Sequence, residues 1–241
     1  MAESAGILLL NAEDNSVSGL TITEEGSNNL TIAAGAALHG SLGYNFSYDG
    51  TNNLLYFQRA FTAGADIYMR FYFYIPSAFS SNTSYLTLGG LYYNNALGVA
   101  CYVRCYYTGG NFTLDRLYYT HNGGSAYVIL SGTITRDTLH YLELRYKSGA
   151  GDGEVECWLD GTSKGSATSL TNNTYQASYA LIGNVAAGIP TTDADLFFDD
   201  IKVDSSYIGA YADETTGGGL LVGASALVGG GVLCGQGNLI N

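Results

Sequence analysis

Carboxylates and histidines are the side chains best suited to acid–base chemistry, and the sequence places few of them together. Hydrolysis of a glycosidic bond uses two carboxyl groups about 5 to 9 Å apart. The nearest match is Glu154-Val155-Glu156, whose two carboxylates share one face of a predicted strand. By itself this alternating pair does not predict hydrolysis.

The three histidines are far apart in the sequence. His39 and His121 lie in glycine-rich turns, and His140 begins a predicted strand. We interpret each as structural. No serine-nucleophile motif occurs, and the glycines at 217–219 do not precede a predicted helix, as a phosphate-binding loop would. We therefore predict no catalytic residue and expect that the protein is not an enzyme.

The four cysteines do not form a disulfide or zinc motif. Cys101 and Cys105 lie four residues apart on a predicted strand, which separates their Cα atoms by about 13 Å, farther than the roughly 7 Å that a disulfide spans. Cys157 and Cys234 are isolated, and no histidine is close in sequence. We predict that Cys101, Cys105 and Cys157 are small core residues.

Aromatic and arginine residues form a more specific pattern. They alternate with apolar residues in the segments IYMRFYFYI, CYVRCYY, HYLELRYK and EVECWLDG. Aromatic rings stack on sugar C–H faces and arginine bonds hydroxyl groups, so sugar binding is one interpretation; a protein interface and plain cross-strand packing stay open. We expect this ligand face to lie on one sheet. Its members are Tyr68, Arg70, Tyr72, Tyr74, Tyr102, Arg104, Tyr106, Tyr141, Arg145 and Trp158.

The charge and the N-terminal sequence narrow the partners. A formal net charge of -12 repels nucleic acid and anionic membranes. No apolar run reaches the roughly 18 residues of a membrane helix, and MAESAGILLLNAEDN lacks the basic start of a secretory signal. We expect synthesis in a cytosol and no nucleic-acid or membrane partner.

Period-two alternation must position these side chains. The 241 residues, 46% of them hydrophobic, suffice for one sizeable core, and the strand-like segments are separated by turns at 49–50, 109–110, 123–124 and 160–161. Gly151 to Gly153 is predicted to form a hairpin turn. The sequence predicts an all-β fold, an antiparallel β-sandwich of jelly-roll type.

The C-terminus has a different pattern. After a domain at 1–209 and a linker at 210–219, residues 220–241 form a glycine-rich arm of hexads. A lone hexad coil would expose its leucines, because such coils bury a core only when at least three stack. We predict that the arm assembles with copies of itself, for example as a trimer, or in a partner's groove; a disordered tail is the alternative. The assembly residues are Leu221, Leu227, Leu233 and Leu239.

Several segments carry a resemblance to a known family. They are a His-Gly segment in 36–61, an R-F-Y-F strand in 67–76, an E-L-R-Y strand and W-x-D-G hairpin in 140–161, and a late F-D-D-I strand in 193–209. Their order resembles concanavalin A-like, laminin-G-like jelly rolls found in many bacterial and phage proteins. The resemblance covers residues 10–209. It implies the fold, which carries lectins, lyases, glucanases and structural modules.

The resemblance also implies candidate chemistry. Hydrolases of this fold carry E-x-D-x-x-E, and lyases carry R-T-E-L and Q-x-H segments, none of which occurs here. Such jelly rolls often hold one Ca²⁺ between the first and last strands, and Ca²⁺ takes 6 to 8 oxygen ligands. The candidate ligands are Glu13, Asp14, Asn15, Asp199 and Asp200.

These features together predict a non-enzymatic phage virion surface protein. It would be a capsid decoration (cement) protein or a tail or fibre adhesin, made in the host cytosol, with itself, other virion proteins and surface glycans as partners. The alternatives are a carbohydrate-binding, lectin-type module of a bacterium, which would reach the outside by a non-classical route, and a polysaccharide lyase.

Overall fold

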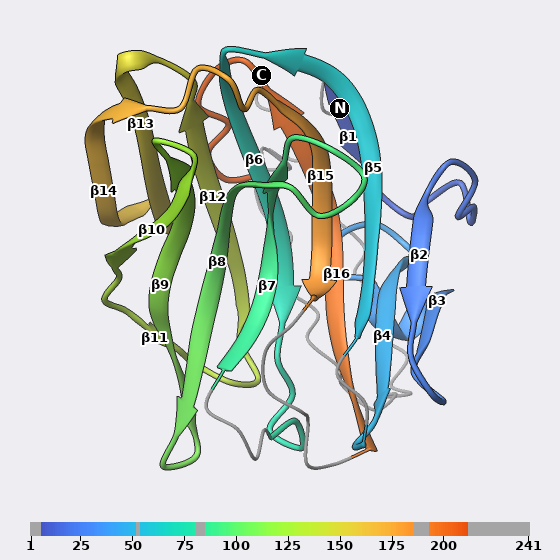
Figure 1. Cartoon of the computed structure of the whole chain (residues 1–241). Coiled ribbons are helices and arrows are strands. Elements are labelled where there is room, and N and C mark those ends of the chain that lie inside the picture. Colours follow the sequence, from blue (N-terminus) through green and yellow to red (C-terminus); the bar gives the residue numbers. More distant parts are fainter. Residues whose placement is uncertain (1–5, 52–53, 81–84, 186–192, 212–241) are drawn as a thin grey trace, which may run out of the picture. The chain divides into compact units, whose positions relative to one another are not determined.

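A computed structural model describes residues 6–51, 54–80, 85–185 and 193–211. Within these ranges the chain forms two antiparallel sheets and one short 3-10 helix (Figure 1). The predicted all-β antiparallel sandwich is therefore confirmed. Sheet A has the strand order β14-β13-β12-β6-β16-β4-β3, with β1 paired to β16, and sheet B has the order β10-β9-β8-β7-β15-β5-β2, with β11 paired to β9.

The strands of sheet A are β1 (Leu8–Leu10), β3 (Asn29–Ala33), β4 (Gly43–Asp49), β6 (Asp66–Tyr74), β12 (Leu139–Lys147), β13 (Ala150–Leu159), β14 (Thr162–Thr171) and β16 (Asp193–Asp204). Those of sheet B are β2 (Thr21–Glu24), β5 (Leu55–Gly64), β7 (Tyr85–Tyr92), β8 (Val99–Thr108), β9 (Asn111–His121), β10 (Gly124–Ile129), β11 (Thr133–Ile134) and β15 (Ala177–Asn184). The 3-10 helix η1 is Ala34–Ala36. No helix among the described residues is long and apolar enough to cross a membrane.

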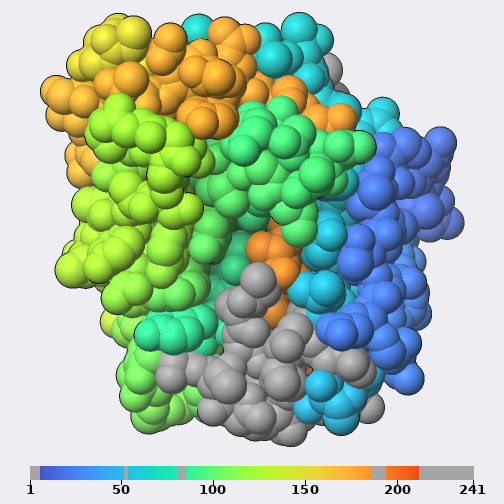
Figure 2. All heavy atoms as spheres, viewed as in Figure 1, coloured from blue at the N-terminus to red at the C-terminus, as the bar shows by residue number. Residues whose placement is uncertain are grey.

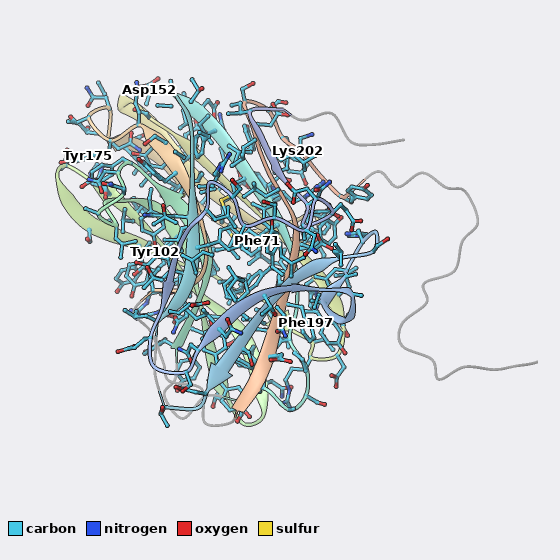
Figure 3. All side chains as sticks on the ribbon, turned by 90° about the vertical axis from the view of Figure 1, so that its right-hand side faces the viewer. Phe71, Tyr102, Asp152, Tyr175, Phe197 and Lys202 are labelled. Atoms are coloured by element: carbon cyan, nitrogen blue, oxygen red, sulfur yellow. The ribbon has the colours of Figure 1, made fainter. Side chains whose placement is uncertain are left out.

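The core lies between the two sheets, where the apolar sides of the strands meet. Phe46 of β4 and Phe57 of β5 approach to 5.9 Å between ring centroids across the two layers. The predicted alternation holds, because Phe71 of β6 is buried with the core cluster while its neighbours point outward. Figure 3 shows Phe71 inside the sandwich and Tyr102 and Phe197 on opposite sides of it. Cys101, Cys105 and Cys157 are buried free thiols, as predicted.

Two irregularities change the predicted pattern. In β7 the register with β8 shifts between Thr87 and Gly89, so two consecutive residues face inward and the side-chain alternation reverses. The predicted turn at Gly151–Gly153 lies instead inside β13, where the register with β14 is irregular. A Cβ at Gly153 would lie 2.3 Å from Asn172 Oδ1, so this glycine makes room for a side chain rather than for a turn.

The first and last strands of the described chain are neighbours in sheet A. Leu10 of β1 pairs with Ile201 of β16, and the chain then continues along the sheet as far as Tyr211, the last described residue, whose backbone bonds to Tyr72. The predicted arm at 220–241, with Leu221, Leu227, Leu233 and Leu239, lies outside the described residues. Assembly through it stays a prediction.

Candidate functional site

The ten residues of the predicted ligand face lie on two sheets rather than one. Strands β6, β12 and β13 are neighbours in sheet A, whereas β8 lies in sheet B between β7 and β9. The outer face of sheet A therefore carries Tyr68, Arg70, Tyr72, Tyr74, Tyr141, Arg145 and Trp158, and that of sheet B carries Tyr102, Arg104 and Tyr106. Alternation identified which residues point outward, but it holds no information about which sheet a strand joins.

On sheet A, the segment Tyr207–Tyr211, here called the C-terminal cap, covers the middle of the outer face. Both carboxylate oxygens of Glu143 accept backbone N–H groups of the cap, from Ile208 at 2.6 Å and from Gly209 at 2.8 Å. Arg70, directly opposite Glu143 on β6, donates to the Gly209 carbonyl at 3.2 Å. Arg70 and Glu143 are both 0% exposed, and the cap covers them.

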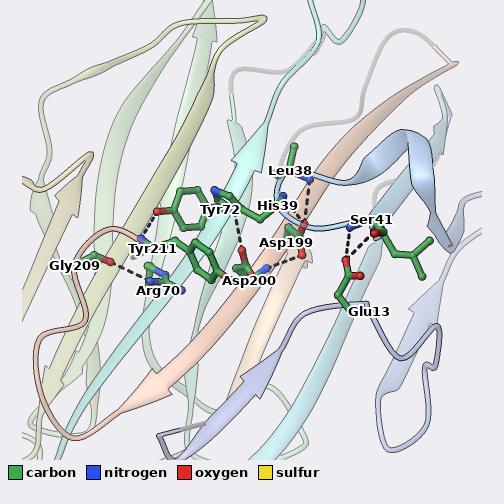
Figure 4. A network of polar contacts seen from close by, with 11 residues as sticks. Glu13, Leu38, His39, Ser41, Arg70, Tyr72, Asp199, Asp200, Gly209 and Tyr211 are labelled. Carbon is green, nitrogen blue, oxygen red and sulfur yellow. Dashed lines mark hydrogen bonds and ion pairs between the residues drawn. The ribbon is translucent and has the colours of Figure 1, made fainter. Parts of the chain in front are cut away.

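The cap also packs on aromatic residues of sheet A. The Tyr211 N–H donates to the Tyr72 hydroxyl, and the Tyr211 ring stacks on His39 at 4.8 Å (Figure 4). At the other end of the cap, the Tyr207 ring lies 5.3 Å from Trp158, which in turn stacks on Tyr68 at 6.4 Å. These contacts make the middle of sheet A a packed structural cluster.

The carboxylates predicted to bind Ca²⁺ instead accept hydrogen bonds from backbone N–H groups. Oε1 of Glu13 accepts from Ser41 at 2.7 Å and Leu42 at 2.8 Å, and Oδ2 of Asp199 accepts from Leu38 and His39, each at 3.0 Å (Figure 4). The expected meeting of the first and last strands is present, and its carboxylates hold the turn at 38–42.

The other two acidic candidates also have protein partners. Asp200 Oδ2 lies 2.7 Å from His39 Nδ1, and Asp14 accepts from the Ser16 N–H at 3.0 Å. Among the described residues no three His, Cys, Asp or Glu side chains are grouped to hold a metal. The arrangement thus does not fit the expected site, and Ca²⁺ binding stays a prediction.

The remaining acid–base candidates of sheet A also have protein partners. Arg145 bonds to Asp66 at 2.8 Å and to Glu154, and Glu156 accepts from the Ser163 hydroxyl at 2.6 Å. Because each glutamate has its own partner, the Glu154–Glu156 pair is not arranged as two facing catalytic carboxyl groups.

Two histidines are likewise held by the protein. His140 lies between Asp160, 2.7 Å from Nδ1, and the Thr135 carbonyl, 3.0 Å from Nε2. His121 Nδ1 accepts from the Thr171 N–H at 3.1 Å. Both arrangements agree with the structural roles predicted for these residues.

Sheet B differs, because its outer face holds a pocket. The pocket has a volume of about 230 Å³. Figure 2, which looks onto this face, shows part of β15 at the bottom of a hollow beside β7 and β8. Gly90 makes room for the pocket wall, since a Cβ there would lie 2.5 Å from that of Tyr102. The lining residues are Tyr85, Thr87, Tyr92, Leu97, Val99, Tyr102, Arg104 and Val185.

The loop at 93–98 forms one side of this pocket and is held by local polar contacts. The Asn94 side chain accepts the N–H groups of Ala96 at 3.0 Å and Gly98 at 2.8 Å. Gln58 of β5 donates from Nε2 to the Asn95 carbonyl at 3.2 Å. These bonds hold Leu97, a lining residue, over the sheet.

The pocket contains a buried hydroxyl group without a partner. Tyr92 is 1% exposed, and its hydroxyl has no hydrogen-bond partner among the described residues. The Oε1 atom of Gln58, on the same outer face, is also buried without one. Burial raises the pKa of Tyr92 far above its ordinary value, so the phenol is protonated at neutral pH. A buried polar atom without a partner is rare in folded proteins and indicates a place for a ligand or water.

Arg104 is the charged residue of the pocket and is held rigidly. Its guanidinium lies 3.7 Å from the Tyr85 ring centroid and 4.8 Å from that of Tyr118. Its Nε and Nη2 donate to Asp115 at 2.8 and 2.5 Å, which leaves Nη1 without a partner among the described residues. Burial raises the pKa of neighbouring Tyr102, and the positive charge of Arg104 opposes that shift.

Sequence reasoning missed Tyr85 and Tyr92 of this pocket. They lie in SYLTLGGLYY, where the register shift at Gly89 brings both tyrosines to the same face although their spacing is odd. The paired glycines inside an apolar strand were the available signal, because glycine in a strand interior often marks a bulge or a close backbone approach.

Comparison with known proteins identifies the fold at low sequence identity. No protein-family model matches the chain, and no curated protein sequence matches it. Among solved structures, an endo-β-1,4-glucuronan lyase from the fungus Trichoderma reesei is similar, with a TM-score of 0.59, 11% identity, and 83% of this chain and 95% of that chain covered.

Two further solved structures have a similar overlap. An alginate lyase from a Chlorella virus has a TM-score of 0.55 and 11% identity over 74% of this chain and 88% of its own. A carbohydrate esterase from the Shiga toxin-encoding bacteriophage phi24B has a TM-score of 0.56 and 16% identity over 82% and 97%. These likenesses agree with the sandwich fold seen here.

The comparisons correct the first functional prediction. A non-enzymatic virion decoration protein or adhesin was expected from the missing catalytic motifs and the C-terminal hexads. The similar structures instead include lyases that act on polysaccharides. That expectation gave weight to an arm outside the described residues and to missing motifs, and neither identifies the function of a fold that carries many functions.

Proposed function

We propose that the protein binds a polysaccharide across the outer face of sheet B, with one sugar in the pocket. The observation that carries the proposal is a pocket lined by both Tyr92 and Arg104, where the buried Tyr92 hydroxyl has no hydrogen-bond partner among the described residues. Leaving such a hydroxyl unpaired costs about 1 to 3 kcal/mol, which a ligand hydroxyl would recover. The pocket's size, about 230 Å³, suits a single sugar ring.

The lining of the pocket has the composition of a sugar site. Tyr85 and Tyr102 supply aromatic surface, and Arg104 supplies a fixed donor. Sites of this kind combine apolar walls with a few placed polar groups. The low-identity likeness to lyases and a carbohydrate esterase supports the same assignment through the fold alone. Within that proposal we place the sandwich among the concanavalin A-like jelly rolls.

A second candidate function is β-elimination of a uronic-acid polysaccharide by the same pocket. Arg104 would neutralise the uronate carboxylate, a base would take the C5 proton, and the C4–O bond would break to leave a C4=C5 double bond. Tyr92 is the protonated phenol nearest to this role, but burial raises its pKa and makes it a weaker donor to the leaving oxygen. The observation that favours a lyase is the fixed positive charge of Arg104 in the pocket.

The proton acceptor is the weaker part of the lyase candidate. Among the described residues that line the pocket, none is a histidine or carries a carboxylate. His39 and His140 contact Tyr72 and Phe73 of sheet A. Tyr102 would have to act as the base, and its raised pKa opposes that role. Binding is therefore proposed first and cleavage second.

The test compares two tyrosine variants that each lose one hydroxyl. Tyr92→Phe removes the unpaired hydroxyl, so it should weaken binding of polyglucuronate or alginate oligosaccharides about tenfold, or ~1.4 kcal/mol, without lowering stability. Tyr48→Phe is the control, because the Tyr48 hydroxyl donates to the Leu55 carbonyl on the core side. The control should lose about 1 kcal/mol of stability and bind normally. Calorimetric titration and thermal melting read the two effects.

Two results would overturn the binding proposal: no affinity for acidic or neutral polysaccharides, or a Tyr92→Phe variant that binds as tightly as the wild type. The lyase candidate is tested in the same samples by the ultraviolet absorbance of unsaturated sugar. Binding without that absorbance removes the lyase candidate and leaves the binding proposal standing.

A further inference from the structure

Two rows of outward side chains cross sheet B beyond the pocket. The strand register places Gly90, Tyr102, Tyr118 and Tyr127 opposite one another on β7, β8, β9 and β10. The neighbouring row is Thr87, Arg104, Arg116 and Ile129. Each row begins at the pocket and ends on β10, the last strand of the sheet. The rows run across the strands rather than along them.

The arginine row carries an unbalanced charge. Arg104 and Arg116 are directly opposite each other, a placement that destabilises a sheet unless the charges are compensated. They share one carboxylate, Asp115 Oδ2, which lies 2.5 Å from Arg104 Nη2 and 3.8 Å from Arg116 Nε. Two guanidinium groups and one carboxylate leave one positive charge in this group. A ligand anion beside Arg116 would balance it.

The tyrosine row fixes the geometry of these charges. The Tyr102 and Tyr118 rings stack at 4.9 Å, and Tyr118 and Tyr127 lie 5.6 Å apart. Arg116 lies 4.3 Å from the Tyr127 ring and donates to the Tyr118 hydroxyl at 3.1 Å. Side chains locked in this way lose little conformational freedom when a ligand binds. Tyr127 is 49% exposed, so the outer end of the row is open to solvent.

We propose that an acidic polysaccharide lies across β8, β9 and β10, with one carboxylate-bearing sugar at Arg104 and the next at Arg116 and Tyr127. This inference rests on the proposed function and adds the charge, length and direction of the ligand. Neighbouring strands lie about 4.8 Å apart, a step close to one sugar ring in an extended chain. The backbones that carry Arg104 and Arg116 are therefore separated by about the length of one sugar.

The positive charge at Arg104 and Arg116 contrasts with the net negative charge of the whole molecule. With a net charge of -12, the protein repels polyanions at most of its surface. A local pair of arginines is then needed to hold an acidic chain, and it would also fix where the chain lies. Binding should weaken as salt concentration rises, because exposed charges are screened.

The test uses two matched sets of oligosaccharides, glucuronan and cello-oligosaccharides, which share a β-1,4 glucose-type backbone and differ in the carboxylate. Arg116→Gln should weaken binding of glucuronan hexasaccharide about tenfold and leave glucuronan disaccharide and all neutral chains unchanged. Wild-type affinity should rise from the glucuronan disaccharide to the hexasaccharide, and Tyr127→Ala should reduce that rise. Lys147→Gln is the control, because it removes one positive charge from sheet A, where Lys147 faces the exposed Asp152 at 3.4 Å.

The outcomes separate this inference from the proposed function. If Arg116→Gln binds the hexasaccharide as tightly as the wild type while Tyr92→Phe is impaired, the row is not a subsite and the pocket proposal stands. If neutral and acidic chains bind equally, the acidic specificity is wrong. If Tyr92→Phe and Arg116→Gln both bind every chain like the wild type, both proposals fail.

Discussion

The outer faces of the two sheets carry the same residue types and differ in what covers them. On sheet A, Arg70 and Glu143 are completely buried, and the C-terminal cap supplies their hydrogen bonds. On sheet B, within the part of the chain that the structure describes, Arg104 Nη1 and the Tyr92 hydroxyl have no hydrogen-bond partner, and both residues line a pocket. Tyrosine and arginine on a strand face therefore do not identify a binding site by themselves. What distinguishes the two faces is that the cap covers Arg70 and Glu143 on sheet A, whereas Arg104 and Tyr92 line a pocket on sheet B.

The largest expected effect comes from breaking the packed cluster of sheet A. Glu143→Ala leaves Arg70 buried beneath the cap and removes the acceptor of two cap N–H groups. Removing one member of a buried charged pair typically costs 3 to 5 kcal/mol, and we expect about 3 kcal/mol in the free energy of unfolding. Urea unfolding measures this loss.

The matched control for that variant replaces both charged residues. Arg70→Met combined with Glu143→Leu removes both members of the buried pair, so it should recover part of the lost stability. Polysaccharide affinity should equal that of the wild type in both variants, once each is folded. A Glu143→Ala variant as stable as the wild type would contradict the structural role of the cap.

The second-largest expected effect is a pH dependence of the folding stability, which arises from Asp199 on sheet A. Burial, together with the neighbouring charge of Asp200, raises the pKa of Asp199 from 3.8 to about 6. The folded state therefore holds the proton more tightly than the unfolded state, and stability falls as pH rises from about 4 to about 6. We expect a contribution on the order of 1 to 3 kcal/mol.

Asp199→Asn tests this dependence, because it cannot titrate. The difference in unfolding free energy between wild type and variant should change across pH 4 to 6, which bracket the two pKa values, and stay constant above that range. Denaturant unfolding at several pH values gives the comparison. A difference that is flat from acid to neutral pH would show that Asp199 does not carry the shift.

A smaller effect is expected when Arg104 of sheet B and Arg145 of sheet A, which both pair with carboxylates, are replaced and polysaccharide affinity is compared. Arg104→Lys keeps the charge but loses the planar group held between Tyr85 and Tyr118. We expect polysaccharide affinity to fall about tenfold, or ~1.4 kcal/mol. Arg145→Lys changes the Asp66 and Glu154 contacts of sheet A, and it should leave affinity unchanged. Equal losses of affinity in both variants would mean that the two faces do not differ in function.

Much of the fold was predictable because alternation is a local property. The apolar sides of β6, β8, β12 and β13 follow directly from the sequence, and so does the all-β class. The partner of each strand does not, because pairing is set by contacts far apart in the chain. Arg70 illustrates this limit, since its outward direction was predicted correctly while its cover comes from Gly209, far along the chain.

The candidate site was less predictable for two physical reasons. The register shift in β7 reverses the alternation, so Tyr85 and Tyr92 share a face that a regular strand would not give them. The acidic residues near both chain ends have the right types for Ca²⁺, but Glu13 and Asp199 accept backbone N–H groups of the turn at 38–42. Residue type alone does not distinguish a metal ligand from a carboxylate that holds a turn.

The most direct test of the account is to map where an acidic polysaccharide binds. Amide chemical shifts recorded during titration with glucuronan hexasaccharide should move at Tyr92, Tyr102 and Arg104 of sheet B. Those of Arg70 and Glu143, and the indole signal of Trp158, the single tryptophan, should stay in place because they belong to sheet A. Shifts that centre on sheet A, or no shifts at a saturating concentration of the oligosaccharide, would contradict the assignment of sheet B as the binding face.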